Sequence, residues 1–261
     1  MDQLPKIEFA TARSGRIAYQ RFGEGSEPIV AVPPSAQNIE VGWDQPDVRR
    51  MLERFATFSD YVHFDKLGTG GSDRSRLISG VDERVDDLRA VMDSAGIESA
   101  HLFAQSEGGP WTLLFAATYP HRVKSLILFG STARMTNDAA DPEDQQARHE
   151  AFAAAWGTPD SRVVDLFAPS KSGDAEYRRW HQRYERLSAS SDSILDLLRM
   201  NVDLDVREVL PALDVPVLVL HRRNDAIIPL EWGEEVADLV SNAQLIVLDG
   251  ADHFAYLGEL D

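Results

Sequence analysis

Ser106 lies in a segment whose residue types could turn its hydroxyl into a nucleophile. The stretch 99–105 (Ser-Ala-His-Leu-Phe-Ala-Gln) runs up to this serine, and a helix-forming segment follows it. A strand that turns sharply into a helix accepts only small residues two positions before and two positions after the nucleophile, and Ala104 and Gly108 meet that requirement. Such a turn would raise the hydroxyl at the carboxyl edge of a sheet, with unpaired helix N–H groups available to a developing oxyanion.

His253 is the histidine best placed to act as the base that such a serine needs. The segment 244–248 reads as a strand, and His253 follows it after the short sequence Asp-Gly-Ala-Asp. The pattern Ala-x-Ser-x-Gly is short, so a serine that caps a buried helix is the alternative interpretation. The other six of the seven histidines lie within predicted strands (His63, His101, His221), after a helix-ending Tyr-Pro (His121) or in the central polar helical region (His149, His181).

The base in turn needs a carboxylate, which fixes the tautomer of the imidazole and stabilises the imidazolium. Asp225 follows the apolar strand pattern 216–221, whereas Asp249 and Asp252 lie close in sequence to His253. A carboxylate so near in sequence has difficulty reaching around the imidazole of His253 to its far ring nitrogen. We therefore favour Asp225 as the acid and keep the other two as competitors.

The elements that must bring these residues together alternate between strands and helices. Residues 7–22 read as a short antiparallel pair that turns at Ser14-Gly15. The later strands are predicted at 29–33, 61–65, 100–105, 124–129, 216–221 and 244–248. Helical patterns between most of them predict an α/β fold with a mostly parallel eight-stranded sheet and helices on both faces. In 81–92 the apolar residues recur at helical spacing, which predicts one face on the sheet and a charged face in water.

Residues 131–209 interrupt this alternation and read as an inserted helical cap. Helix starts are predicted at Asp141-Pro142 and at 158–160 (Thr-Pro-Asp), with a long polar helix at 174–187. The domain organisation predicted is a core of 1–130 and 210–261 with the cap between its two parts. A cap over the carboxyl edge would form much of a substrate pocket and exclude water. The candidate pocket residues are Trp111, Phe152, Trp156, Trp180, Tyr184 and Phe254, with Phe167 and Met200 as further candidates.

Several segments of the chain resemble the α/β-hydrolase superfamily, from near residue 7 to the end. The stretch 29–35 (Ile-Val-Ala-Val-Pro-Pro-Ser) looks like the strand and oxyanion loop, and 64–74 looks like the D-x-R-G-x-G-x-S turn of that family. More narrowly, 64–74, 83–93 and 106–120 are similar to hydrolase-like domains found beside nucleotide cyclase domains in actinobacteria. The resemblance implies the order Ser106, Asp225, His253 for a catalytic triad, with no metal and no cofactor.

The chain also departs from the family pattern at two places. Pro33-Pro34-Ser35 replaces the usual His-Gly-x of the oxyanion loop, and the resemblance implies Ser35 and Glu107 as the residues whose N–H groups receive the oxyanion. Leu67 occupies the position where the turn usually carries arginine, which removes an ion-pair anchor. We expect the turn itself to be structural, with no chemistry from Asp65 or Ser72.

Composition limits the classes of partner and of site. The 261 residues, 43% of them hydrophobic, suffice for one α/β domain with a cap, and the absence of cysteine excludes disulfides and a thiol nucleophile. A formal charge of −17 disfavours nucleic acid and anionic membrane surfaces as partners. The N-terminus shows no apolar export segment, so a cytoplasmic protein is expected. The expected partner is a small-molecule substrate, with a homodimer left open as the assembly.

Two functions of different class follow from these residues. The first is a serine hydrolase that cleaves a carboxylic ester of a small to medium apolar substrate through an acyl-enzyme; carbon–carbon bond hydrolysis also stays open, because the pocket decides. The second is a ligand-sensing or interaction module with little turnover. An intact set of Ser106, Asp225 and His253 favours the enzyme, since a binding module has no physical need of all three.

The C-terminus gives one further expectation. The chain stops at Asp261, soon after His253, where related sequences usually continue into a helix packed on the sheet. If that helix is missing, we expect an exposed apolar strip near the first strands and a lowered stability.

Overall fold

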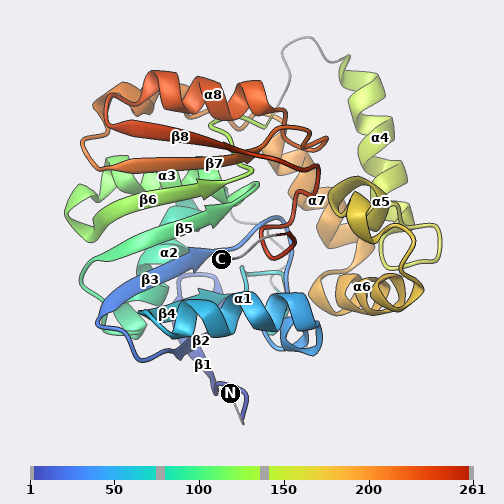
Figure 1. The fold of residues 1–261 in the computed structure, drawn as a ribbon, viewed down its shortest axis with the longest axis horizontal. Coiled ribbons are helices and arrows are strands. Elements are labelled where there is room, and N and C mark those ends of the chain that lie inside the picture. Colours follow the sequence, from blue (N-terminus) through green and yellow to red (C-terminus); the bar gives the residue numbers. More distant parts are fainter. Residues whose placement is uncertain (1–2, 75–79, 136–140, 259–261) are drawn as a thin grey trace.

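One eight-stranded sheet organises the chain (Figure 1). The computed structural model describes residues 3–74, 80–135 and 141–258. The strand order is β1-β2-β4-β3-β5-β6-β7-β8; β2 runs antiparallel to β1 and β4, and the other neighbours are parallel. The strands are β1 (Ile7–Ala12), β2 (Gly15–Phe22), β3 (Glu27–Val32), β4 (Ser59–Phe64), β5 (Ala100–Gln105), β6 (Val123–Phe129), β7 (Val217–Arg222) and β8 (Ala243–Leu248). The predicted fold class is confirmed.

Helices cover both faces of the sheet and one end of it. Figure 1 shows α1 in front of the sheet, α2 and α3 behind it, and α4 to α7 beyond the arrowheads of the central strands. The helices are α1 (Pro46–Ala56), α2 (Val81–Ser94), α3 (Gly108–Thr118), α4 (Pro142–Ala155), α5 (Val163–Phe167), α6 (Ala175–Ser188), α7 (Ser191–Asn201) and α8 (Leu230–Leu239). None of the helices in the described part of the chain is long and apolar enough to cross a bilayer.

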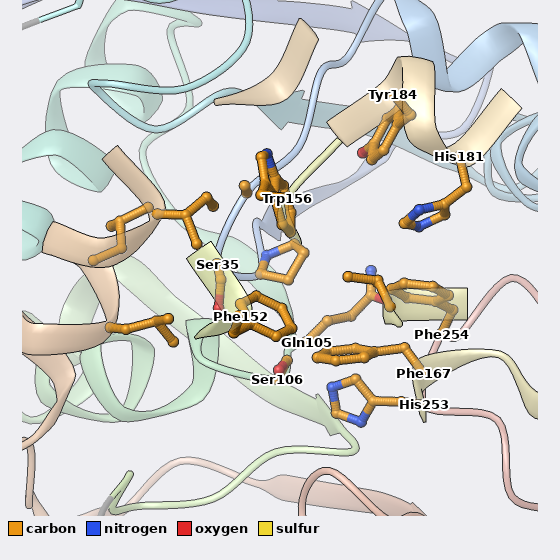
Figure 2. Close-up of a pocket in the computed structure, with 16 residues that line it drawn as sticks. Ser35, Gln105, Ser106, Phe152, Trp156, Phe167, His181, Tyr184, His253 and Phe254 are labelled. Carbon is orange, nitrogen blue, oxygen red and sulfur yellow. The ribbon is translucent and has the colours of Figure 1, made fainter. Parts of the chain in front are cut away.

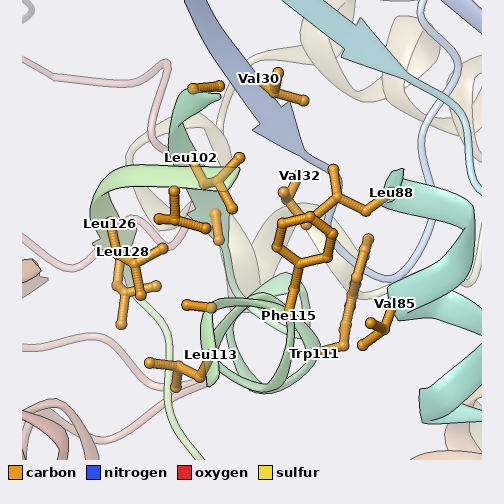
Figure 3. Close-up of a cluster of buried hydrophobic side chains, with 14 of the residues drawn as sticks. Val30, Val32, Val85, Leu88, Leu102, Trp111, Leu113, Phe115, Leu126 and Leu128 are labelled. Atoms are coloured by element: carbon orange, nitrogen blue, oxygen red, sulfur yellow. The ribbon is translucent and has the colours of Figure 1, made fainter. Parts of the chain in front are cut away.

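The two faces of the sheet form separate apolar clusters because successive strand residues point to opposite sides. Val30, Val32 and Leu102 point toward α2 and α3, where they pack with buried residues of those helices (Figure 3). Ile29 and Phe103, each one position away, pack on the α1 side instead. The central strands are therefore apolar on both faces, which is the pattern of a buried parallel sheet.

The segment between β6 and β7 holds α4 to α7, and we call these four helices the helical insertion. Two of them begin where the sequence predicted, because the carboxylates of Asp141 and Asp174 accept hydrogen bonds from N–H groups in the first turns of α4 and α6. The helix start expected at Thr158 is wrong. The hydroxyl of Thr158 accepts the N–H of Asp160 at 3.2 Å, which closes a local turn, and α5 begins only at Val163.

Hydrogen bonds of polar side chains stabilise the turn that follows β4. The Asp65 carboxylate accepts the N–H groups of Ile39 at 3.0 Å and Gly71 at 2.8 Å. The Ser72 hydroxyl donates to the Asp65 carbonyl at 2.6 Å and accepts the N–H of Ala18 at 2.8 Å. Burial raises the pKa of Asp65 to about 8, although the two N–H donors act in the opposite direction. These contacts fix the turn against β2 and the loop after β3.

The charged side of α2 differs from the sequence-based expectation, because part of it is buried rather than in water. Arg84 and Asp87 are 1% and 4% exposed. The Arg84 guanidinium donates to the carbonyl of Leu67 at 3.2 Å and lies 3.6 Å from the Asp87 carboxylate. An arginine from α2 thus anchors the turn at the position where the turn itself carries leucine.

Two phenylalanine side chains are exposed at the surface. Phe9 on β1 is 45% exposed, and Phe58, just before β4, is 51% exposed. Phe58 also borders a groove that is lined by residues of α1 and of strands β5 to β8 and includes Arg54 and Arg222.

Candidate active site

Ser106 occupies a strained turn at the carboxyl end of β5. Its φ of +51° is the one positive value among the non-glycine residues that the structure describes. Two hydrogen bonds from the β6 side hold this turn: the Ser106 N–H donates to Phe129 O at 3.2 Å, and the Ser131 hydroxyl donates to Ser106 O at 2.5 Å. The left-handed region costs a non-glycine residue about 1–2 kcal/mol, so these contacts hold Ser106 in a strained conformation.

This strain leads to a stability prediction for two variants that both lack the hydroxyl. Ser106→Gly is expected to be about 1 kcal/mol more stable than Ser106→Ala, because glycine adopts a positive φ at no steric cost. Urea unfolding of the two proteins measures the difference. An alanine variant as stable as the glycine variant would show that the backbone at this position is relaxed.

The residues after Ser106 must be small because the helix packs closely on neighbouring loops. A Cβ added to Gly108 would come within 2.8 Å of the carbonyl oxygen of Pro33, and one added to Gly109 would overlap the Ser131 hydroxyl at 1.8 Å. The sequence-based requirement for a small residue two positions after the serine therefore has a direct cause. The contact also brings the Pro33-Pro34-Ser35 loop against the N-terminus of α3.

Asp225 and His253 form a buried pair at the ends of β7 and β8. His253 Nδ1 lies 2.7 Å from Asp225 Oδ2, and the two side chains are 3% and 1% exposed. Asp225 Oδ1 accepts the N–H groups of Ile227 at 2.8 Å and Ile228 at 3.2 Å. Gly130 allows this close packing, since a Cβ there would lie 3.1 Å from the Asp225 carboxylate in a backbone with φ of +50°.

The environment of Asp225 favours its ionised form. Burial acts to raise the pKa of this carboxyl, but the hydrogen bond and charge of His253 and the two N–H donors outweigh it, so that the pKa lies below its ordinary value. A carboxylate that stays ionised accepts Nδ1–H and leaves Nε2 of His253 as the proton acceptor. Nε2 is buried and has no hydrogen-bond partner among the described residues.

The two competing carboxylates lie elsewhere. The Asp249 side chain is fully exposed, 3.9 Å from Arg223. Asp252 accepts the N–H of Ser170 at 2.9 Å. Neither makes a contact with the imidazole of His253, so the structure joins His253 to Asp225 alone of the three.

The two N–H groups expected to receive an oxyanion border the nucleophile turn. Ser35 lines the same cavity as Ser106, and Figure 2 shows Ser106 between Ser35 and His253. Glu107 is the residue before the first turn of α3. Neither the Ser35 N–H nor the Glu107 N–H donates a hydrogen bond to another group in the described part of the chain. Both donors are therefore available to a ligand.

The Glu107 side chain lies in a buried charged cluster outside the cavity. Its carboxylate pairs with Lys66, and the two side chains are 0% and 1% exposed. Burial lowers the pKa of Lys66 to about 8, against the attraction of the Glu107 charge. The ion pair holds the side chain of Glu107, which is the residue directly before α3. Lys66 comes from the same turn, one position before Leu67, so this ion pair joins the turn to the start of α3 while Arg84 joins it to α2.

A largely apolar cavity opens beside Ser106 and His253 (Figure 2). Its walls come from the loop after β3, the end of β5, the loop after β8 and the helical insertion. Seven of the 16 lining side chains carry a polar atom, namely Ser35, Gln105, Ser106, Trp156, His181, Tyr184 and His253. The other nine are Pro34, Ala36, Phe152, Val163, Phe167, Ile194, Leu197, Leu198 and Phe254. None of these 16 described residues is Asp, Glu, Lys or Arg.

The candidate pocket residues divide between this cavity and other places. Phe152, Trp156, Phe167, Tyr184 and Phe254 line it. Trp111, Trp180 and Met200 do not. Trp111 is 1% exposed in the core between α3 and the sheet, because its position on α3 faces Phe64 rather than the turn. Trp180 borders a neighbouring cavity and stacks on Tyr184 at 5.0 Å.

Two polar cavity residues escaped the sequence analysis. Gln105 directly precedes Ser106, and no local pattern in the sequence marked it as a cavity residue. His181 was set aside with the other helical histidines, although Glu185 follows it four positions later on the same helix face. That spacing was the available signal for a paired histidine. No cluster of three or more His, Cys, Asp or Glu side chains in residues 3–74, 80–135 and 141–258 could hold a metal ion.

Comparisons with known proteins agree with this architecture. A family model described as alpha/beta hydrolase fold matches residues 51–260. The chain is 26% identical over 248 residues to a 2-hydroxy-6-oxo-2,4-heptadienoate hydrolase of Pseudomonas putida, covering 88% of this chain and 83% of the relative. It is 31% identical over 206 residues to a 2-hydroxymuconate semialdehyde hydrolase of Pseudomonas putida, covering 74% of this chain and 70% of the relative.

Solved structures extend the likeness to the fold as a whole. An esterase from Rhodococcus sp. ECU1013 superposes with a TM-score of 0.74 at 22% identity, covering 96% of this chain and 92% of the esterase chain. Because the family model spans most of the chain and the strand order and helical layers agree with it, the protein belongs to the α/β-hydrolase fold family.

Proposed function

We propose that the protein is a serine hydrolase that cleaves a carboxylic ester of a small to medium apolar substrate through an acyl-enzyme. The observation that carries this proposal is the buried Asp225–His253 pair, whose free Nε2 borders the same cavity as the Ser106 hydroxyl. A base, its orienting carboxylate and a nucleophile on a strained turn are the parts that acyl transfer needs.

In the first half of the reaction the Ser106 oxygen attacks the ester carbonyl carbon while His253 Nε2 takes the hydroxyl proton. The carbonyl oxygen becomes an oxyanion that the N–H groups of Ser35 and Glu107 receive. The tetrahedral intermediate collapses, the bond to the alcohol oxygen breaks, and the imidazolium gives its proton to the leaving alcohol. Asp225 stays ionised and stabilises the imidazolium throughout.

The second half releases the acyl group to water. His253 takes a proton from a water molecule, whose oxygen attacks the acyl carbon, and the same two N–H donors receive the second oxyanion. Collapse returns the proton to the Ser106 oxygen and frees the carboxylic acid. The aromatic walls formed by Phe152, Phe167 and Phe254 exclude bulk water, which strengthens each electrostatic contact in the site.

The lining of the cavity favours an uncharged substrate. The relative from Pseudomonas putida is named for a heptadienoate, which is a carboxylate. A buried carboxylate needs a charged partner or several hydrogen-bond donors, and none of the 16 lining residues is lysine or arginine. An ester with an apolar acyl chain meets no such cost.

Carbon–carbon bond hydrolysis is the second candidate, and the names of the two Pseudomonas relatives favour it. The test compares kcat/KM of the protein for p-nitrophenyl butyrate and for 2-hydroxy-6-oxo-2,4-heptadienoate. We expect the ester to be the better substrate. A higher kcat/KM for the dienoate would replace the ester assignment with the carbon–carbon one.

The resemblance to cyclase-associated domains suggests a third candidate function, a ligand-sensing module with little turnover. Reaction with a fluorophosphonate separates it from an enzyme, because the probe modifies a serine only where a base and an oxyanion site activate it. Stoichiometric labelling at Ser106 supports the hydrolase. An unlabelled protein that hydrolyses neither substrate above the uncatalysed rate would favour the sensing role.

A further inference from the structure

The helical insertion holds a second buried histidine–carboxylate pair, and the histidine of this pair lines the same cavity. His181 Nδ1 lies 2.8 Å from Glu185 Oε1 one helical turn further along α6, and the two side chains are 3% and 1% exposed. His181 lines the cavity together with Ser106 and His253. In Figure 2 it projects from α6 on the wall opposite Ser106.

Two other donors already hydrogen-bond the Glu185 carboxylate, which therefore acts as an acceptor toward His181. Its Oε1 also accepts the Ser161 hydroxyl at 3.0 Å, and its Oε2 accepts the N–H of Gly157 at 2.5 Å. A carboxylate that already accepts two donors is an acceptor toward the imidazole, so Nδ1 carries the proton. In the neutral ring Nε2 then has a free lone pair.

The ring is packed so that Nε2 remains for a ligand. His181 stacks on Phe254 at 5.5 Å and on Tyr177 at 5.9 Å, and Trp180 meets it edge-on. Nε2 makes no hydrogen bond with any residue in the described parts of the chain. The Nε2 atom is not among the fully buried side-chain atoms that lack a partner, so it is open to the cavity that His181 lines, and a substrate that displaces water there must bring it a hydrogen-bonding group.

The charges near the His181–Glu185 pair restrict the chemical nature of the substrate group that could bind Nε2. Glu185 already places one negative charge against the ring, and the cavity lining adds no lysine or arginine that could balance a second. An anionic substituent would therefore be disfavoured. An uncharged group can donate a hydrogen bond to the lone pair of Nε2, and a hydroxyl is the simplest such donor.

We propose that His181, held by Glu185, is a specificity-determining residue that accepts a hydrogen bond from a hydroxyl group on the acyl chain of the substrate. This inference rests on the proposed ester hydrolysis, since it names the substrate class of that site. Gln105 extends from the Ser106 side of the cavity toward His181 and Phe254 (Figure 2), so a chain running from Ser106 to His181 passes its amide.

The test measures the ratio of kcat/KM for hydroxylated and plain acyl esters in wild type and His181→Phe. Methyl octanoate is compared with its 6-, 7- and 8-hydroxy derivatives, which scan the hydroxyl along the chain. Phenylalanine keeps an aromatic ring for the stacking on Phe254 but has no nitrogen. We expect the ratio for the best hydroxy ester to fall by about tenfold or more, the usual scale for an unpaired hydrogen-bonding group in a binding site.

A matched control and the contrary outcomes define the test. His149→Phe makes the same substitution on a histidine of α4 that does not line the cavity, and it should leave the ratio as in wild type. Equal losses for plain and hydroxylated esters in His181→Phe would show a merely structural role and overturn the proposal. A wild-type preference for oxo derivatives over hydroxy derivatives would show that Nε2 carries the proton, which also overturns it.

Two further measurements keep the proposal testable if the variant or the activity fails. If wild type hydrolyses no ester, the proposed function fails, and calorimetry of the same esters with Ser106→Ala tests recognition alone; a tighter Kd for the hydroxy ester is expected. If His181→Phe does not fold, ¹⁵N NMR of the histidine rings reports on wild type. A hydroxy ester bound to Ser106→Ala should shift the Nε2 resonance of His181, and bound ester without a shift overturns the assignment.

Discussion

Ser106→Ala is expected to lower kcat for ester hydrolysis by about a thousandfold or more, the scale seen when a member of a catalytic triad is removed. Alanine retains the Cβ and the fold of the turn but has no oxygen to attack the ester carbonyl. The N–H groups of Ser35 and Glu107 remain, so a small residual rate from the oxyanion site is expected. Hydrolysis of p-nitrophenyl butyrate measures the loss.

Further variants test whether the residues of the proposed triad act as one unit or contribute to the rate independently. Ser106→Ala, His253→Ala and the double variant should show similar residual rates, because residues that act as a unit are strongly non-additive. Ser125→Ala is the matched control, since this serine hydrogen-bonds His101 on the sheet and lies outside the cavity. Comparable rates for wild type and Ser106→Ala would reject the proposed nucleophile.

Lys66→Met is expected to lower the free energy of unfolding by about 3–5 kcal/mol, because it leaves the Glu107 carboxylate buried without its partner. Both side chains of the pair are at most 1% exposed. Methionine matches the length of the lysine stem, so the lost charge is the main change. Urea unfolding followed by circular dichroism measures the effect.

Two comparisons test whether the charge is the cause. Lys66→Met combined with Glu107→Leu should recover most of the lost stability, since no buried charge then remains unpaired. Lys124→Met breaks the Lys124–Glu27 pair at 2.6 Å, whose side chains are 35% and 59% exposed, and should leave the free energy of unfolding nearly unchanged. A double variant as unstable as Lys66→Met would point to lost packing instead of an unpaired carboxylate.

The sequence predicted the strands well because their patterns are local. Short apolar runs predicted strands at 100–105 and 124–129, and β5 and β6 occupy Ala100–Gln105 and Val123–Phe129. Helix starts with a capping aspartate before a helical run, at Asp141 and Asp174, were equally readable. The expected start at Thr158 failed because a threonine hydroxyl can cap a turn as readily as a helix.

The location of side chains on helices was harder to predict than the helices themselves. Arg84 and Asp87 follow the pattern of a solvated face, yet the neighbouring turn buries them. Trp111 has the residue type of a pocket wall but faces the core. Amphipathic spacing describes a helix against one partner, whereas here two elements pack against the same helix and the second is far away in sequence.

The order of Ser106, Asp225 and His253 along the chain, the small residues around the serine and the presence of a helical insertion between two core strands could all be read from the sequence. Only the tertiary structure decided which carboxylate meets His253, which aromatic side chains reach the cavity, and that His181, paired with Glu185, lines it. The reason is physical: a residue type and its local spacing fix what a side chain can do, but its partners are brought close by the packing of elements distant in sequence, and that packing is set by the whole core.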